Sequence, residues 1–169
     1  VGPVTRKIPS GIDFATRTRT GECEMKVESY FTLREGARRL DMKTVIQNNA
    51  ENHRVVMLTK HGIQSELLMA EGQFNMVERE ITPWAGWKNP SKPGKMTNFF
   101  GVEDEKCGVF VAGRGLNEYE VLRDEGHTLS LTIHRGTHEL GDWGDFPTRE
   151  AQCIGELKVE YSLVTYSMT

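Results

Sequence analysis

Two histidines and two aspartates in the last third of the chain could bind a metal. His134 and His138 are four positions apart, and Asp142 and Asp145 follow closely. On a helix this spacing would place both imidazoles on one face, as in zinc proteases. Here strand-like sequence and glycines such as Gly136 make a helix improbable. On an extended chain the two histidines start about 13 Å apart, too far to share an ion with ligands near 2 Å. We therefore expect no metal site in this chain.

Asp142 and Asp145 could instead be the carboxylate pair of a glycosidase, which needs two acids roughly 5 to 9.5 Å apart. Their spacing in the sequence permits that distance without indicating it. Acidic residues beside glycines are typical of turns, and Gly141 precedes Asp142 as Gly144 precedes Asp145. The turn interpretation is favoured for the pair.

Three tryptophans, Trp84, Trp87 and Trp143, offer a different chemistry. An exposed indole can stack on a sugar face, whereas a packed indole closes a core while its polar edge stays wet. For Trp143 both interpretations stay open. For Trp84 and Trp87, which lie in the proline-rich loop 83–94, the packing interpretation is favoured.

Arg114 lies between Gly113 and Gly115, directly after an apolar run. The glycines let the backbone turn sharply, so the guanidinium could project from a strand end into a cleft. Its planar fork suits paired hydroxyls or a carboxylate. The alternative is a structural arginine that binds turn carbonyls, and the residues alone favour that alternative.

The elements that must position these residues are strands. Met25, Val27, Phe31 and Leu33 alternate with charged residues, and this period of two predicts a half-buried strand. Ten such runs are predicted: 22–33, 40–46, 53–58, 66–70, 74–81, 96–102, 108–112, 119–122, 128–134 and 157–166. A single helical turn over 64–69 is a weaker alternative for that short apolar run. About ten strands with almost no helix predict an all-β fold, an antiparallel β-sandwich.

Composition limits the remaining classes. The 169 residues, 37% of them hydrophobic, can bury one core, and we expect a lead-in over 1–21 and a single domain over 22–169. The net charge of −3 disfavours nucleic acid as a partner.

Three widely spaced cysteines indicate buried thiols rather than disulfides. Without a signal peptide or long apolar run, the expected compartment is the cytoplasm and no membrane partner is expected. Because the chain begins at Val1, we expect a fragment of a longer polypeptide.

Several short motifs share one order along the chain. They are Phe31–Gly36, Arg39-Leu40-Asp41, Asn48-Asn49, Asn52-His53-Arg54, Glu71–Phe74, Val77-Glu78-Arg79, Arg114-Gly115-Leu116, Glu118-Tyr119, Leu129–Arg135 and Ala151-Gln152-Cys153. In this order the chain resembles the C-terminal β-domain of the family 38 glycoside hydrolases, the α-mannosidases and their mannosylglycerate-hydrolase relatives. The resemblance covers residues 22–166.

This resemblance implies a large sandwich of the galactose-mutarotase type that packs on an N-terminal catalytic domain. In such retaining enzymes that domain supplies the aspartate nucleophile and holds zinc through His and Asp ligands. None of those motifs occurs in this chain, so zinc is expected outside it and no catalytic residue within it. The fragment alone is expected to be inactive.

The resemblance also implies that this domain contacts the sugar, through loops at one end of the sandwich. The candidate substrate contacts are Arg114, Asn117, Glu118, Trp143 and Asp145. The expected partners are the catalytic domain and an α-mannoside, and a homodimer stays open. The alternatives are a free-standing carbohydrate-binding module and a structural interaction domain.

Overall fold

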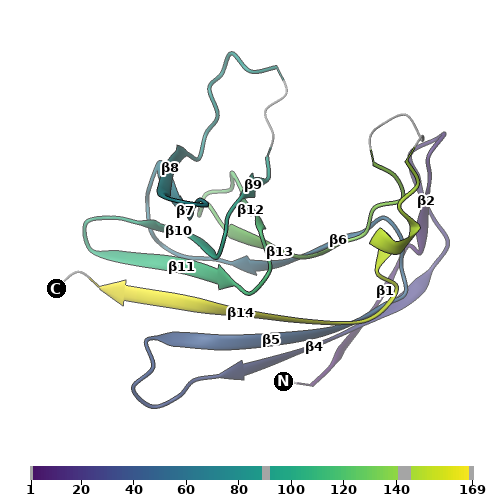
Figure 1. Ribbon diagram of the computed structural model, residues 1–169, viewed down its shortest axis with the longest axis horizontal. Coiled ribbons are helices and arrows are strands. Elements are labelled where there is room, and N and C mark those ends of the chain that lie inside the picture. The colour runs from purple at the N-terminus through teal and green to yellow at the C-terminus, as the bar shows by residue number, and fades with distance from the viewer. Residues whose placement is uncertain (1, 89–91, 141–145, 168–169) are drawn as a thin grey trace. The chain divides into compact units, whose positions relative to one another are not determined.

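The computed structural model describes residues 2–88, 92–140 and 146–167, and nearly all of its regular structure is β (Figure 1). The strands are β1 (Val4–Ile8), β2 (Gly11–Asp13), β3 (Thr18–Thr20), β4 (Cys23–Thr32), β5 (Arg39–Asn48), β6 (Arg54–Thr59), β7 (Leu67–Glu71), β8 (Met76–Glu80), β9 (Gly94–Lys95), β10 (Phe99–Glu103), β11 (Cys107–Gly113), β12 (Glu118–Val121), β13 (Leu129–Arg135) and β14 (Gly155–Ser167). One short 3₁₀ helix, η1, spans Arg149–Gln152. None of the described helical segments is long and apolar enough to cross a membrane.

The strands form three sheets. The order is β1-β4-β5-β14-β11-β10-β7-β8 in an eight-stranded sheet, β6-β13-β12-β9 in a four-stranded sheet, and β2-β3 in a hairpin. The pairs β1–β4, β10–β11, β11–β14 and β12–β13 are all antiparallel. The chain divides into two compact units. Unit 1 is Val1–Tyr30, Lys43–Val55 and Ile133–Val159, and unit 2 is Phe31–Met42, Val56–Thr132 and Glu160–Thr169.

In unit 1 the first residues of the chain take part in the sheet. Val4–Ile8 pair with Cys23–Val27 from Val4↔Val27 to Ile8↔Cys23, so part of the expected lead-in is an edge strand. In β5, Thr44, Ile46 and Asn48 are buried at every second position, as the alternation of that segment predicts. The expected division at residue 21 stays a prediction.

Unit 2 has a core between two sheets. Phe100 on β10 stacks on Tyr119 on β12, with ring centroids 4.6 Å apart and an interplanar angle of 16°. Both side chains are almost completely buried, as are Val111, Leu129 and Leu131. Because β10 belongs to the eight-stranded sheet and β12 to the four-stranded one, this contact is the sheet-on-sheet packing of a sandwich. The all-β sandwich expected from the sequence is confirmed.

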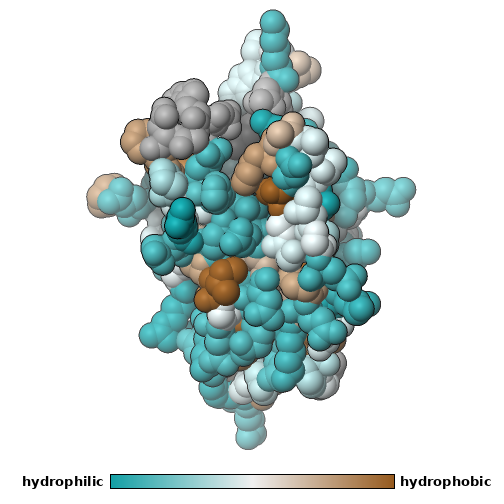
Figure 2. Space-filling view, turned by 90° about the vertical axis from the view of Figure 1, so that its right-hand side faces the viewer, coloured by the Kyte–Doolittle hydropathy of each residue, from teal (hydrophilic) through white to brown (hydrophobic). Residues whose placement is uncertain are grey.

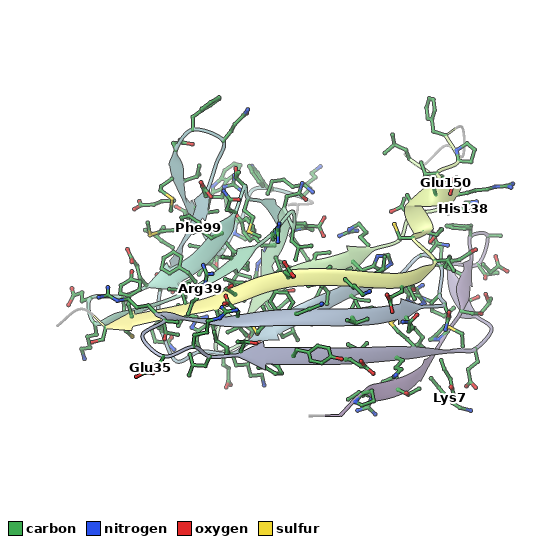
Figure 3. The ribbon with its side chains drawn as sticks, turned by 60° about the horizontal axis from the view of Figure 1, so that its bottom comes forward. Lys7, Glu35, Arg39, Phe99, His138 and Glu150 are labelled. Carbon is green, nitrogen blue, oxygen red and sulfur yellow. The ribbon has the colours of Figure 1, made fainter. Side chains whose placement is uncertain are left out.

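The ten predicted strands form as β4–β8 and β10–β14. The turn between β4 and β5 carries Glu35 (Figure 3) and closes through the Ala37 N to Arg34 O hydrogen bond, with Gly36 at φ 74°. The helical turn considered for 64–69 is wrong, because Leu67–Glu71 pair with β8 along their whole length. Phe31 and Leu33, expected on a half-buried face, are 57% and 73% exposed.

The surface carries isolated apolar side chains. On the face in Figure 2, most residues are hydrophilic and the apolar ones form no continuous patch. Single exposed apolar residues are normal on a folded protein. Exposure alone therefore does not identify a binding site, and an exposed aromatic residue is a candidate only where it lines a pocket.

Candidate functional site

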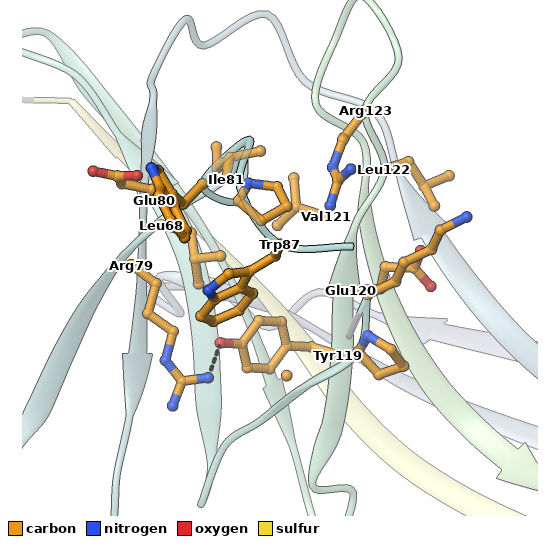
Figure 4. A pocket seen from close by; sticks show the side chains of 15 residues that line it. Leu68, Arg79, Glu80, Ile81, Trp87, Tyr119, Glu120, Val121, Leu122 and Arg123 are labelled. Carbon is orange, nitrogen blue, oxygen red and sulfur yellow. Dashed lines mark hydrogen bonds between the residues drawn. The ribbon is translucent and has the colours of Figure 1, made fainter. Parts of the chain in front are cut away.

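Unit 2 contains a pocket of about 710 Å³, lined partly by tryptophans, which we call the tryptophan pocket. Its volume is typical of small-molecule sites. The lining residues are Leu68, Arg79, Glu80, Ile81, Pro83, Trp84, Trp87, Lys92, Pro93, Gly94, Tyr119, Glu120, Val121, Leu122 and Arg123 (Figure 4). They come from β7, the end of β8, the loop that follows it, β9, β12 and the two residues after β12.

The pocket has a rigid base formed by Tyr119. Its ring is only 2% exposed and is held against Phe100. Gly94 pairs with Tyr119 across the β9–β12 ladder, and a Cβ on Gly94 would lie 2.4 Å from the Tyr119 Cζ atom. Glycine at position 94 therefore lets the chain approach the phenol ring closely.

Tyr119 also carries the polar group at the base. Arg79 Nη1 donates a hydrogen bond to the Tyr119 hydroxyl at 3.0 Å, drawn in Figure 4. Burial raises the pKa of the Tyr119 phenol, although Arg79 opposes this. The phenol therefore keeps its proton at neutral pH and can donate a hydrogen bond while it accepts one.

One tight turn presents both tryptophans. Trp87 N donates to Trp84 O at 3.1 Å. The Trp84 ring lies over Gly86, where a Cβ would come within 2.4 Å of the indole. Trp84 is 70% and Trp87 60% exposed, and Figure 4 shows Trp87 pointing toward Tyr119. The packing role favoured from the sequence does not hold for this pair, because a side chain that closes a core would be buried.

The pocket carries charges of both signs. Arg79, Arg123 and Lys92 supply donors, and Glu80 and Glu120 supply acceptors. Flat aromatic surfaces beside such groups can stack on a ligand and hydrogen-bond to its edges. The described pocket residues do not include a nucleophile paired with a base, so the arrangement is suited to binding rather than to bond cleavage.

Arg114 lies at the surface of unit 2, between β11 and β12. Its Nη1 donates to Glu160 Oε2 at 2.9 Å, and its side chain is 84% exposed. Its backbone N donates to Glu160 O at 3.1 Å. Gly115 has a φ of 70°, so the sharp turn expected after Arg114 is present. The guanidinium is thus accessible and paired with an acid, and its contact with substrate stays a prediction.

Asn117 and Glu118 lie beside Arg114 in the sequence but have different surroundings. Asn117 is exposed, and its carbonyl accepts a hydrogen bond from Met96 N at 3.0 Å. Glu118 accepts from Thr132 Oγ1 at 2.8 Å and lies 3.5 Å from Lys95 Nζ. Neither of them lines the tryptophan pocket, and neither does Arg114. Trp143 and Asp145, the other two candidate contacts, lie outside the described residues, as does Asp142.

The histidines of unit 1 have structural surroundings. His134 is 7% exposed and contacts Asn48 Nδ2 through Nε2 at 3.3 Å. His138 packs against the Phe14 ring, with centroids 5.2 Å apart, and Figure 3 shows it beside η1. Burial lowers the pKa of His134, and His53 adds to this. Across residues 2–88, 92–140 and 146–167, no group of three or more His, Cys, Asp or Glu side chains could hold a metal ion.

His134 belongs to a buried polar network made of Asn48, Asn52, His134 and Gln152. Asn48 Nδ2 donates to the carbonyl oxygens of Gln152 and Cys153 at 2.9 and 3.0 Å. Gln152 Oε1 accepts from Asn52 N at 2.7 Å, and Gln152 Nε2 donates to Asn52 Oδ1 at 3.0 Å. Two of the motifs behind the family resemblance, Asn52-His53-Arg54 and Ala151-Gln152-Cys153, therefore meet here for a structural reason.

The pocket residues Arg79 and Tyr119 were not predicted as site residues. Both lie in motifs that were noted only as signs of family, Val77-Glu78-Arg79 and Glu118-Tyr119. No local pattern signals their contact, because they are 40 residues apart and meet only when β8 and β12 are placed. The two tryptophans were the available signal, since an indole can supply a flat surface on which a ligand stacks.

We compared the sequence and the structure of this chain with those of known proteins. No protein-family model matches the chain. It is 32% identical over 143 residues, 85% of its length, to a putative mannosylglycerate hydrolase of Halalkalibacterium halodurans, of which it covers 16%. Its structure matches an α-mannosidase from Enterococcus faecalis with a TM-score of 0.89, and a family 38 glycosyl hydrolase from that organism with a TM-score of 0.84. Both are 30% identical, and each match covers 98% of this chain and 20% of the other.

The similarity to family 38 glycoside hydrolases expected from the motifs is confirmed, and it extends over nearly the whole chain. The chain spans only about a fifth of the length of these relatives. It is thus similar to one domain of a family 38 hydrolase, and most of each relative has no counterpart in these 169 residues.

Proposed function

We propose that this chain is the accessory β-sandwich domain of a longer α-mannosidase, placed C-terminal to a catalytic domain. The observation that supports it is the match over 98% of the chain to an α-mannosidase, combined with a coverage of only 20% of that protein. Among the described residues, the tryptophan pocket holds no nucleophile paired with a base, and no cluster of side chains could bind a metal. A domain of this kind contributes to hydrolysis by covering the cleft and excluding water from it.

In this proposal the full-length protein hydrolyses α-mannosidic bonds with retention of configuration. Such reactions use carboxylate attack, a covalent glycosyl intermediate and hydrolysis by water. Zinc, where the family resemblance implies it, would be bound outside this chain, because the described residues do not fit a zinc site. The cytoplasmic location and a homodimer stay predictions from the sequence.

The decisive experiment compares three samples on an aryl α-mannoside: the natural full-length polypeptide, the same polypeptide without these 169 residues, and these residues alone. We expect turnover only by the first. Zinc-dependent turnover by the 169-residue chain alone would overturn the proposal. Binding of mannosides by the chain without any upstream hydrolase would favour a free-standing carbohydrate-binding module, and self-association in sedimentation without binding would favour an interaction domain.

A second test uses the E. faecalis α-mannosidase that this chain resembles. Replacing its matching fifth with the 169-residue chain should preserve α-mannosidase activity, because the two folds superpose closely. Replacing it with an unrelated β-sandwich of similar size is the control. Equal activity in both chimaeras would show that the matching segment has no specific role, and equal loss in both would show that this chain cannot take the place of that segment.

Within this proposal Arg114 contacts the substrate. Arg114→Ala in the full-length enzyme should lower kcat/KM by an amount equivalent to roughly 1 to 3 kcal/mol, the scale for losing a charge-assisted hydrogen bond. Glu160→Gln is the matched control, since it breaks the same ion pair but keeps the guanidinium. Equal kinetic losses in both variants would make Arg114 a structural residue.

A further inference from the structure

We propose that the tryptophan pocket of unit 2 binds a saccharide. The pocket offers what a pyranose ring requires: flat aromatic surfaces for its C–H face and paired donors and acceptors for its hydroxyls. The stacking argument stands on this chain's own residues. The choice of a mannoside as the probe rests on the function proposed above.

The indole rings supply the stacking surface. Trp84 and Trp87 are 70% and 60% exposed, although burying an aromatic ring removes a large apolar area from water. Both line the pocket, and one turn closed by the Trp87 N to Trp84 O bond presents them together. Exposed rings held in place lose little conformational freedom when a ligand covers them, which favours binding.

The polar groups of the pocket suit a ligand with several hydroxyls better than a ligand with one charged group. A hydroxyl both donates and accepts. Arg79 and Arg123 present planar donor forks, Glu80 and Glu120 present acceptors, and the buried Tyr119 hydroxyl can do both. The Arg79 to Tyr119 hydrogen bond fixes the fork at the base of the pocket. An oriented donor of this kind is what gives a binding site its specificity.

Other classes of ligand fit less well. A purely apolar molecule would strip water from charged side chains without replacing their hydrogen bonds, which costs free energy. A phosphate-bearing nucleotide could stack on the indoles and approach Arg79, Lys92 and Arg123. The carboxylates of Glu80 and Glu120 offset two of these three positive charges, so little net charge remains to hold a doubly charged phosphate. The mixture of donors and acceptors beside two exposed indoles therefore favours an uncharged sugar.

The test measures binding to the 169-residue chain by ligand-observed saturation-transfer NMR. The probes are methyl α-mannoside, an α-linked mannobiose and adenosine monophosphate. We expect saturable binding of the mannosides in the roughly millimolar range, as is usual for small ligands, and none of the nucleotide. No saturable binding of either mannoside, or binding of the nucleotide alone, would overturn the inference.

Variants locate the binding. Trp87→Ala should weaken mannobiose binding about tenfold or more, since truncating a tryptophan that a bound partner covers commonly costs that much affinity. Arg79→Lys keeps the charge but removes the planar fork, so it should also weaken binding. The matched control is Phe74→Ala, which removes a 92% exposed aromatic ring that does not line the pocket. Far-ultraviolet circular dichroism checks folding, and Trp87→Phe replaces Trp87→Ala if that variant unfolds. Equal loss in the Phe74 and Trp87 variants would contradict the assignment.

The binding assay and the hydrolysis assay test the two proposals independently. Absent binding, together with α-mannosidase activity that depends on these 169 residues, would overturn the saccharide pocket and leave the accessory-domain function standing. Binding that persists while the full-length polypeptide shows no α-mannosidase activity would do the reverse.

Discussion

The polar network of unit 1 is buried and hydrogen-bonded within the protein, whereas the tryptophan pocket of unit 2 is open to solvent. In the network, Asn48 is fully buried and Gln152 is 4% exposed. The Asn48 amide bonds to backbone groups of Gln152, Cys153 and Ala50, and the Gln152 amide bonds to the backbone and side chain of Asn52. In the pocket, aromatic rings lie exposed beside charged side chains. Buried and satisfied polar groups fix one structure, whereas exposed aromatic rings leave apolar area for a partner to cover. The first region holds the fold, and the second is suited to recognition.

The largest expected effect separates the two regions by stability. Asn48→Leu leaves the Gln152 and Cys153 carbonyls and the Ala50 N–H without the hydrogen bonds that Asn48 makes. Each buried polar group without a partner costs about 1 to 3 kcal/mol. We expect the free energy of unfolding to fall by about 3 kcal/mol in urea titrations. Asn49→Ala is the matched control, because Asn49 is exposed and its side chain donates to Glu24 O at the surface. Similar losses in both variants would contradict the role of the network.

The next effect is a pH dependence located in the network. An amide nitrogen cannot accept a hydrogen bond, so Asn48 Nδ2 can meet His134 Nε2 only as a donor. This requires that ring nitrogen to be unprotonated and the imidazole to be neutral. Burial lowers the pKa of folded His134, so the unfolded chain takes up a proton first, near pH 6.5. Stability is therefore fully present above about pH 6.5 and falls as the pH drops below it.

The measurement is the unfolding free energy of the wild type and of His134→Gln between about pH 7 and pH 5. The wild type should lose up to about 1.4 kcal/mol per pH unit more than the variant, the limit for one proton. His138→Gln is the control for an imidazole outside the network. Parallel curves for the wild type and His134→Gln would show that His134 does not set this slope.

A smaller effect connects folding with binding at the base of the pocket. Tyr119→Phe keeps the ring on Phe100 but removes the acceptor of the Arg79 hydrogen bond. We expect a loss of about 1 kcal/mol in stability together with weaker mannobiose binding. Tyr30→Phe, which removes a hydroxyl bonded to Glu28 on an exposed ring, is the control. Unchanged binding in Tyr119→Phe would remove the phenol from the recognition surface.

The smallest expected effect is on stability when the tryptophans are removed. Trp84→Ala and Trp87→Ala should change the free energy of unfolding by no more than about 0.5 kcal/mol, as is usual for exposed positions and as their exposure of 70% and 60% implies. Thermal unfolding followed by circular dichroism measures this. A loss as large as that of Asn48→Leu would mean that the indoles support the fold, which would undo the comparison.

Strand positions were largely predictable because alternation is a local property. Thr44, Ile46 and Asn48 occupy every second position of β5 and are buried together, as the period of two requires. The same rule failed for Phe31 and Leu33, which are exposed, because alternation says which side chains share a face but not whether anything covers that face. The short apolar run 64–69 was ambiguous between a helical turn and a strand, and pairing with β8 makes Leu67–Glu71 a strand.

By itself the sequence determined the all-β class, the ten main strands and the similarity to family 38 hydrolases, because each rests on short patterns along the chain. The tertiary structure alone decided which polar and aromatic side chains meet. Arg79 reaches Tyr119 across 40 residues, and Asn48 reaches Gln152 across 104. Such contacts depend on strand order and on how the sheets pack, and no local periodicity carries that information.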